Sequence, residues 1–149
     1  MNNKAIFSIS SLAVILIDQL TKMLVRLNLN RTESIPVIKN IFHITYITNT
    51  GSAFGIFKGL NIVFIIISII VIFAIVYSIK NINEKSKIEF VLFALLLGGV
   101  IGNLIDRIFF GNVTDFMDFR IWPVFNVADS MITISAIALA YYYWKRDNN

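Results

Sequence analysis

Long apolar runs, each beginning or ending at a short polar cluster, dominate this chain. The longest run, 59–79, has 21 residues and no charge. At about 1.5 Å per residue, a helix of this length spans roughly 30 Å, the thickness of the hydrocarbon core of a bilayer. A second run covers 90–105, and flanking apolar residues extend it to 88–110. A third, 130–144, reaches spanning length when residues 125–129 are added, and its tyrosines and tryptophan form an interfacial aromatic belt.

The first apolar run, Ala5–Ile17, has only thirteen uncharged residues. We expect Lys22 and Arg26 to extend their charged ends toward the membrane surface, which would let a helix over 4–27 cross. The run behind Lys4 also resembles the apolar part of a secretory signal peptide, but no small-residue cleavage site follows it. We therefore expect a retained helix.

Residues 28–58 are too polar and too interrupted to cross a membrane. Within them, 41–48 is rich in β-branched and aromatic residues, and a turn signal follows at 49–51. This predicts one or more strands on the membrane surface, whereas 80–87 reads as a hydrophilic connector and 111–125 as a loop. The prediction is an all-α membrane protein of one transmembrane domain, residues 1–149, with an extracytoplasmic β-rich cradle at 28–58. Its four helices are expected at about 4–27, 59–79, 88–110 and 126–144.

If the four runs cross in turn, all of the polar clusters emerge on the same side of the membrane. Carboxylates and amides at membrane depth are expensive and mark function by default. The glycines at 98, 99 and 102 favour close helix packing beside one cluster. The clusters are Asp18–Lys22, Asn49–Gly55, Gly102–Arg107 and Phe125–Ser130.

Composition supports the membrane assignment and narrows the partners. The chain is 57% hydrophobic and 15% charged, against about 45–50% and about 25% in soluble domains. The net charge of +4 comes from lysines and arginines in the short segments between and beyond the apolar runs. Their density at 80–87 favours cytoplasmic termini. A basic face interleaved with aromatics is absent, which argues against nucleic-acid binding.

The residue types also limit the chemistry. The chain has no cysteine and one histidine, His43, which excludes thiol nucleophiles and makes a His-rich metal site unexpected. A Ser–Lys dyad with Lys22 would need a serine beside it, and none is evident. Carboxylate pairs remain: two acids that share one proton can activate water and polarise a peptide carbonyl without metal or cofactor.

Each acid taken alone also has a structural interpretation. Asp129 suits a helix N-cap, and Asp106 could form an ion pair with its neighbour Arg107. Asp115 and Asp118 could be solvated loop acids. Their convergence on one face is what indicates a site.

Five motifs, in order over residues 18–130, carry a family resemblance: DQLTK, NTGSAFG, GGVIGNLIDRI, VTDFMDF and FNVADS. They resemble the lipoprotein signal peptidases (signal peptidase II) of bacteria. The resemblance implies an aspartic endopeptidase of the bacterial cytoplasmic membrane, without cofactor and expected to be a monomer among membrane lipids. Its substrates would be diacylglyceryl-modified prolipoproteins, cleaved just before the lipidated cysteine near the extracytoplasmic face.

The resemblance also assigns roles to individual residues. It implies that Asp115 and Asp129 are the catalytic pair. One departure concerns the connection between them, 116–128, which is several residues shorter than expected for the family. The positions that would support or line the site are Asp18, Lys22, Asn49, Gly51, Gly99, Asn103, Asp106, Arg107, Asn126 and Ala128.

Two other classes compete with the peptidase. A small proton- or ion-coupled transporter would also bury acids, but it would distribute them through the bilayer and often show a repeat between halves. The run at 59–79 carries no acid, and no repeat is evident. A scaffold or assembly factor would leave the polar clusters unexplained.

Overall fold

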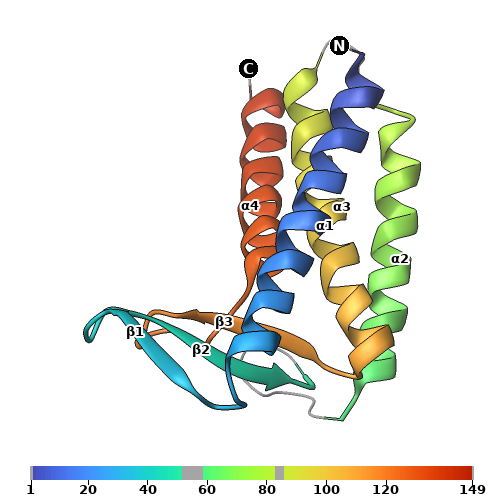
Figure 1. Ribbon diagram of the computed structural model, residues 1–149. Coiled ribbons are helices and arrows are strands. Elements are labelled where there is room, and N and C mark those ends of the chain that lie inside the picture. The colour runs from blue at the N-terminus through green and yellow to red at the C-terminus, as the bar shows by residue number, and fades with distance from the viewer. Residues whose placement is uncertain (1, 52–58, 83–85, 149) are drawn as a thin grey trace.

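The computed structural model of the chain describes residues 2–51, 59–82 and 86–148. Four helices stand side by side, with both ends of the chain at the same end of the bundle, and a small antiparallel sheet lies at the opposite end (Figure 1). The helices are α1 (Asn3–Asn28), α2 (Asn61–Ile79), α3 (Lys87–Phe110) and α4 (Val127–Asp147). The strands, in the sheet order β1-β2-β3, are β1 (Ser34–Ile38), β2 (Phe42–Asn49) and β3 (Val113–Asp118).

Helix boundaries follow from local signals. The side chain of Asn2 caps α1 by accepting from the backbone N–H of Lys4 at 3.1 Å. Gly111 ends α3 in the left-handed conformation, with φ of 72°, which glycine adopts at no steric cost. Each of the four predicted helices is present within three residues of its predicted bounds.

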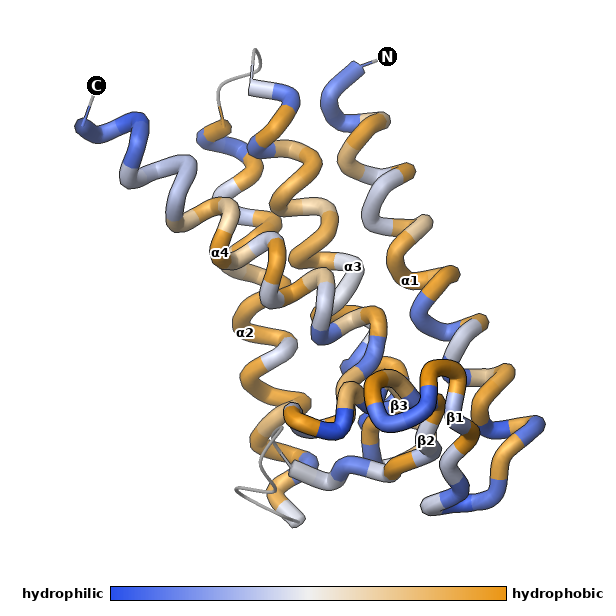
Figure 2. The backbone as a smooth tube through the Cα atoms, turned by 90° about the vertical axis from the view of Figure 1, so that its left-hand side faces the viewer, coloured by the Kyte–Doolittle hydropathy of each residue, from blue (hydrophilic) through white to orange (hydrophobic). Residues whose placement is uncertain are grey.

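Among the residues described, α1, α2 and α3 are long and apolar enough to cross a membrane. Helix α4 has 21 residues but a more polar composition, so its role as a fourth span stays a prediction. Figure 2 shows apolar residues along the helices, and many of them are exposed, such as Phe73 at 71%. Helix α2 buries only Ile75, so most of its surface is suited to lipid.

Helix α3 is central, because it packs against α1, α2 and α4. The predicted close packing of its glycines is confirmed. A Cβ on Gly99 would lie 2.6 Å from the carbonyl oxygen of Ala128 on α4, and one on Gly102 would lie 2.6 Å from Asp18 Oδ2 on α1. Helices α1 and α4 therefore both approach α3 closely along the stretch that carries these glycines.

The interpretation of 111–125 as a loop is wrong for residues 113–118, which form β3. This strand pairs antiparallel with β2, and Asp115 lies opposite Ile47. The sheet is therefore built from two connections of the chain rather than from 28–58 alone. The sequence Val-Thr-Asp-Phe-Met-Asp alternates poorly, so pairing with β2 rather than local pattern makes it a strand.

A small apolar core attaches the sheet to the bundle. Val25 and Leu29, at the end of α1, pack with Tyr46 of β2 and Phe116 of β3. This packing holds the middle of β3 near the end of α1, and Asp115 immediately precedes Phe116 on that strand.

Candidate active site

Asp115 and Asp129 come together from different elements at the sheet end of the bundle. Asp115 lies on β3 and is 2% exposed, whereas Asp129 lies in the first turn of α4 and is partly buried. Both line one small pocket of about 110 Å³. The other lining residues are Asn49, Gly51, Arg107, Val113 and Val124.

Asparagine amides hold both carboxylates. Asn126 Nδ2 donates to Asp115 Oδ1 at 2.6 Å, and Asn49 Nδ2 donates to Asp115 Oδ2 at 3.0 Å. Asn103 Nδ2 donates to Asp129 Oδ1 at 2.7 Å. Asn126 Nδ2 also donates to Asn103 Oδ1 at 3.2 Å, so a continuous hydrogen-bonded chain joins the two acids.

The start of α4 corrects one expectation. Asn126, not Asp129, is the N-cap, and its side chain accepts from the backbone N–H of Asp129 at 2.8 Å. Asp129 is the reciprocal member of a capping box, accepting from the backbone N–H of Asn126 at 3.4 Å. Asparagine and aspartate cap helices about equally well. Residue type alone therefore does not tell which of Asn126 and Asp129 is the N-cap; their positions in the capping box do.

The short connection from β3 to α4 is closed by backbone pairing. Met117 and Phe125 form a bridge in which each backbone N–H donates to the carbonyl of the other, at 2.8 and 3.2 Å. The chain thus turns back over few residues and delivers Asn126 beside Asp115. The connection 116–128, although shorter than the resemblance led us to expect, is therefore long enough to bring Asp115 and Asp129 together.

Burial sets the protonation of the pair. The pKa of Asp115 is raised to about 7, first by burial and then by the negative charge of Asp129. Hydrogen bonds from Asn49 and Asn126 and the charge of Lys22 act in the opposite direction but do not cancel the rise. Near neutral pH, the two carboxyl groups therefore tend to share one proton.

The predicted Asp106–Arg107 ion pair is replaced by other partners. Asp106 pairs with Lys22 at 3.4 Å and with Arg26 at 3.3 Å. Arg107 instead lines the pocket, donates to the carbonyl of Gly51 at 3.5 Å and lies over an aromatic ring of α2. Adjacent residues on a helix do not face one another, so the two side chains separate.

Lys22 does not reach the membrane surface, and the expectation that it would is wrong. Its side chain is fully buried, and Nζ lies 2.9 Å from Asp18 Oδ2. Nζ also donates to Asn103 Oδ1 at 3.0 Å. Arg26 is likewise committed inward, to Asp106 and to the hydroxyl of Thr114 at 3.1 Å.

The buried network around Lys22 positions the two elements that carry Asp115 and Asp129. Asp18 Oδ1 accepts from the backbone N–H of Ala128 at 2.9 Å, which links α1 to the first turn of α4. Asp106 Oδ2 accepts from the backbone N–H of Thr114 at 2.9 Å, beside Asp115 on β3. The network therefore fixes the positions of both elements that carry the pair.

The structure brings every predicted site residue to this region. It also adds residues that sequence reasoning missed as site members: Arg26, Thr114 and Gln19, whose amide donates to Asp18, Asp106 and the carbonyl of Gly102. Gln19 was signalled only by its place in the DQLTK motif. The Ser52–Gly55 part of NTGSAFG lies outside the described residues.

Asp118, expected as a solvated acid, is 5% exposed and takes no part in the pocket. It accepts from Thr45 Oγ1 at 2.8 Å and pairs with Arg120 at 2.9 Å. Within the described ranges, no three His, Asp or Glu side chains are grouped as metal ligands. A reaction without metal stays a prediction.

Three helices apolar enough to span a bilayer, with paired carboxylates at one end of the bundle, define an integral membrane protein with a built polar site. The profile described as signal peptidase (SPase) II matches residues 10–145. The chain belongs to this family of peptidases.

Relatives and solved structures agree with this placement. The chain is similar to the lipoprotein signal peptidase of Halothermothrix orenii, with 48% identity over 137 residues that cover 91% of this chain and 93% of that protein. The corresponding protein of Caldanaerobacter subterraneus subsp. tengcongensis is 46% identical over 129 residues, 86% of this chain and 88% of that protein. The structure of a bacterial membrane enzyme, solved by the in meso method at 2.3 Å resolution, superposes on this chain with a TM-score of 0.89 and 34% sequence identity. The match covers 93% of this chain and 87% of that enzyme.

Proposed function

We propose that this chain removes signal peptides from diacylglyceryl-modified prolipoproteins, cutting the peptide bond before the lipidated cysteine. Asp115 and Asp129 are the catalytic pair. The observation that carries the proposal is their convergence in one small pocket, each held by asparagine amides, at the end of apolar helices. An ion-coupled transporter is less well supported, because Asp18, Asp106 and this pair all gather at that one end.

The geometry supports a division of labour within the pair. Asp129 accepts from the Asn103 amide and from a backbone N–H at the start of a helix, and both interactions favour its ionised form. Asp115, whose raised pKa lets it stay protonated near neutral pH, then carries the shared proton. The other site side chains act by positioning these two carboxyl groups.

Hydrolysis then needs only water and the pair. Ionised Asp129 takes a proton from water as the water oxygen attacks the scissile carbonyl carbon, while Asp115 donates its proton to the carbonyl oxygen. The tetrahedral intermediate collapses when a proton from Asp129 reaches the amide nitrogen and the carbonyl re-forms, returning its proton to Asp115. The C–N bond breaks, and the pair again holds one proton.

The pKa of Asp115 predicts the alkaline limb of the rate profile. Above about pH 7 the shared proton is lost, so kcat/KM should fall about tenfold per pH unit beyond that limb. Measured from pH 5 to 9 in detergent, a rate that keeps rising through pH 9 would contradict the shared-proton mechanism.

The same shift predicts a change in stability with pH. The folded-state pKa of Asp115 lies above its ordinary value of 3.8, so the folded state binds more protons between about pH 4 and 7. This group's contribution therefore falls as pH rises through that window. As the pH rises from 5 to 8, the melting temperature of Asp115→Asn should fall less than that of the wild type.

The lipid on the substrate should matter strongly. The pocket holds only about 110 Å³, so the acyl chains must lie outside it, against the apolar helix surfaces and the bilayer. Burial of acyl chains contributes about 0.8 kcal/mol per CH₂, which keeps the cleavage site at the membrane. We expect at least a hundredfold lower kcat/KM for a precursor that lacks the diacylglyceryl group. Equal cleavage of both forms would contradict the proposed substrate class.

We also propose four membrane spans, with both termini in the cytoplasm of a bacterium and the pocket near the extracytoplasmic face. Helix α4, at about 1.5 Å for each of its 21 residues, reaches roughly 30 Å. Action as a monomer stays a prediction. Reporter fusions after residue 149 should read cytoplasmic and those after residue 40 extracytoplasmic. A cytoplasmic signal at residue 40 would contradict this topology.

A further inference from the structure

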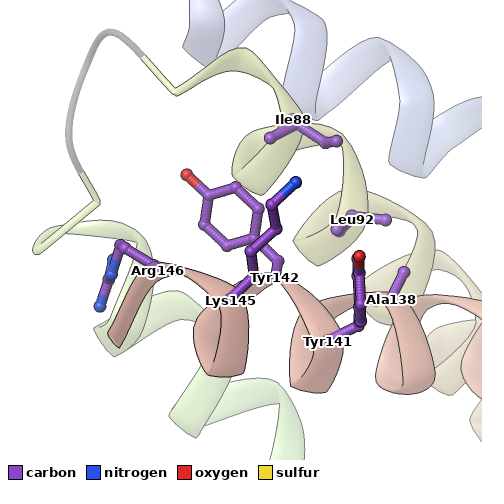
Figure 3. A pocket seen from close by; sticks show the side chains of 7 residues that line it. All are labelled: Ile88, Leu92, Ala138, Tyr141, Tyr142, Lys145 and Arg146. Atoms are coloured by element: carbon purple, nitrogen blue, oxygen red, sulfur yellow. The ribbon is translucent and has the colours of Figure 1, made fainter. Parts of the chain in front are cut away.

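A second concave site lies at the opposite end of the bundle from the acid pair. It is a groove of about 520 Å³ between the first turns of α3 and the last turns of α4. Figure 3 shows Ile88 and Leu92 of α3 facing residues of α4 across this space. The residues contributed by α4 are Ala138, Tyr141, Tyr142, Lys145 and Arg146.

The groove is apolar within and polar at its mouth. Ile88, Leu92 and Ala138 supply aliphatic walls, whereas the side chain of Lys145 extends over the space from the last turn of α4 (Figure 3). The hydroxyl of Tyr142 lies 2.9 Å from that of Ser86. Two hydroxyls carry two hydrogens, and their mutual bond uses one, so one O–H can still donate to a third group.

The surroundings of the groove are apolar at the level of the helices. Ile88, on its wall, is 54% exposed, and Ile137 and Trp144 on α4 are 66% and 64% exposed. In a membrane these surfaces face hydrocarbon, so acyl chains have direct lateral access to the groove. With about 520 Å³, it lies within the range of about 300–1,000 Å³ that is typical of ligand sites.

The charge at this end is basic. Of the described acids here, Glu89 and Asp147 both pair with Arg146, at 3.3 and 3.7 Å. The other described cations at this end are Lys4, Lys80, Lys87 and Lys145, the last of which also has a partner of its own, so cations outnumber acids among the described residues. A ligand that is apolar along its length and anionic at its head matches this arrangement.

We propose that this groove binds an anionic phospholipid. One acyl chain lies along Ile88, Leu92 and Ala138, and the phosphate meets the Lys145 ammonium and the hydroxyl pair of Ser86 and Tyr142. The site is separate from the acid pair and goes beyond the proposed peptidase function.

The test measures binding of dioleoyl phosphatidylglycerol and dioleoyl phosphatidylcholine to the purified full chain by native mass spectrometry, with melting temperatures in parallel. The wild type should prefer phosphatidylglycerol about fivefold, the contribution of one lysine near an anionic headgroup. Lys145→Gln should abolish that preference. Ala138→Phe, which fills the groove, should weaken the binding of both lipids.

Two controls keep the proposal falsifiable. Lys80→Gln removes a lysine from the same end but outside the groove lining, and it should keep the preference. If Ala138→Phe does not fold, Ala138→Leu replaces it. Ala138→Leu should also weaken the binding of both lipids, but to a smaller extent. Unchanged binding in both Ala138 and Lys145 variants would overturn the proposal. An equal loss of the phosphatidylglycerol preference in Lys80→Gln would also overturn it, because that result would indicate a general surface potential. So would displacement of the bound lipid by an added apolar peptide helix that binds more tightly.

Discussion

Asp115→Asn and Asp129→Asn should each lower turnover by about 10⁴-fold or more, the upper range for general acid–base catalysis, and both variants should still fold. Either change keeps the size of the side chain but removes the group that titrates. The remaining carboxyl group cannot both accept a proton from water and donate one to the carbonyl. Single-turnover cleavage of a lipidated precursor, at matched concentration of folded protein, measures the loss.

Two neighbouring acids serve as matched controls. Asp118→Asn alters an acid that lies outside the pocket and pairs with Arg120, so it should leave turnover within about threefold of the wild type. Asp106→Asn should lower the melting temperature, because it weakens a fully buried ion pair with Lys22, yet leave cleavage by each folded molecule measurable. An inactive Asp106→Asn protein beside an active Asp115→Asn protein would reassign the catalytic pair.

Lys22→Met should produce the largest loss of stability, about 3–5 kcal/mol in the free energy of unfolding. The substitution leaves Asp18 and Asp106 fully buried without the cation between them. It also removes a donor to Asn103, which holds Asp129. Denaturant unfolding in detergent, followed by tryptophan fluorescence, measures the change.

Lys39→Met is the control for Lys22→Met, because Lys39 is exposed. A surface substitution of this kind usually stays within about 0.5 kcal/mol. If Lys22→Met changed stability by no more than this control, the buried network would not hold α1, α3 and β3 together as described.

The helices and the catalytic candidates could be predicted from the sequence because each rests on a local signal. Long apolar runs predicted the helices, and the alternation of crossings placed the polar clusters at one end. The contacts of Asn103 with Asp129 and Lys22, and of Arg107 with Gly51, confirm that these clusters meet. Motif positions then selected Asp115 and Asp129, which local physics alone left among several acids.

The pairing of charges could not be predicted, because it depends on how helices pack. Lys22 was expected at the membrane surface, but close approach at Gly102 brings α3 against α1. That approach turns Lys22 toward Asp18, Asp106 and Asn103 in the interior. No local pattern distinguishes a lysine that reaches outward from one that compensates buried carboxylates.

Strand β3 was missed for a related reason. Its ladder partner, β2, lies more than 60 residues earlier in the chain, and its own sequence contains two aspartates. Long-range backbone pairing makes it a strand, and the same pairing turns Asp115 toward Asn49 and Asn126. The site thus depends on a contact that no window of sequence displays.

The most direct test of the central claim is the mass of the products released from a diacylglyceryl-modified precursor by the purified wild-type protein and by Asp129→Asn. The account predicts that the wild type releases an intact signal peptide and leaves a product that begins at the lipidated cysteine, and that Asp129→Asn releases neither. Cleavage at another bond, or the same products from Asp129→Asn at the wild-type rate, would contradict it.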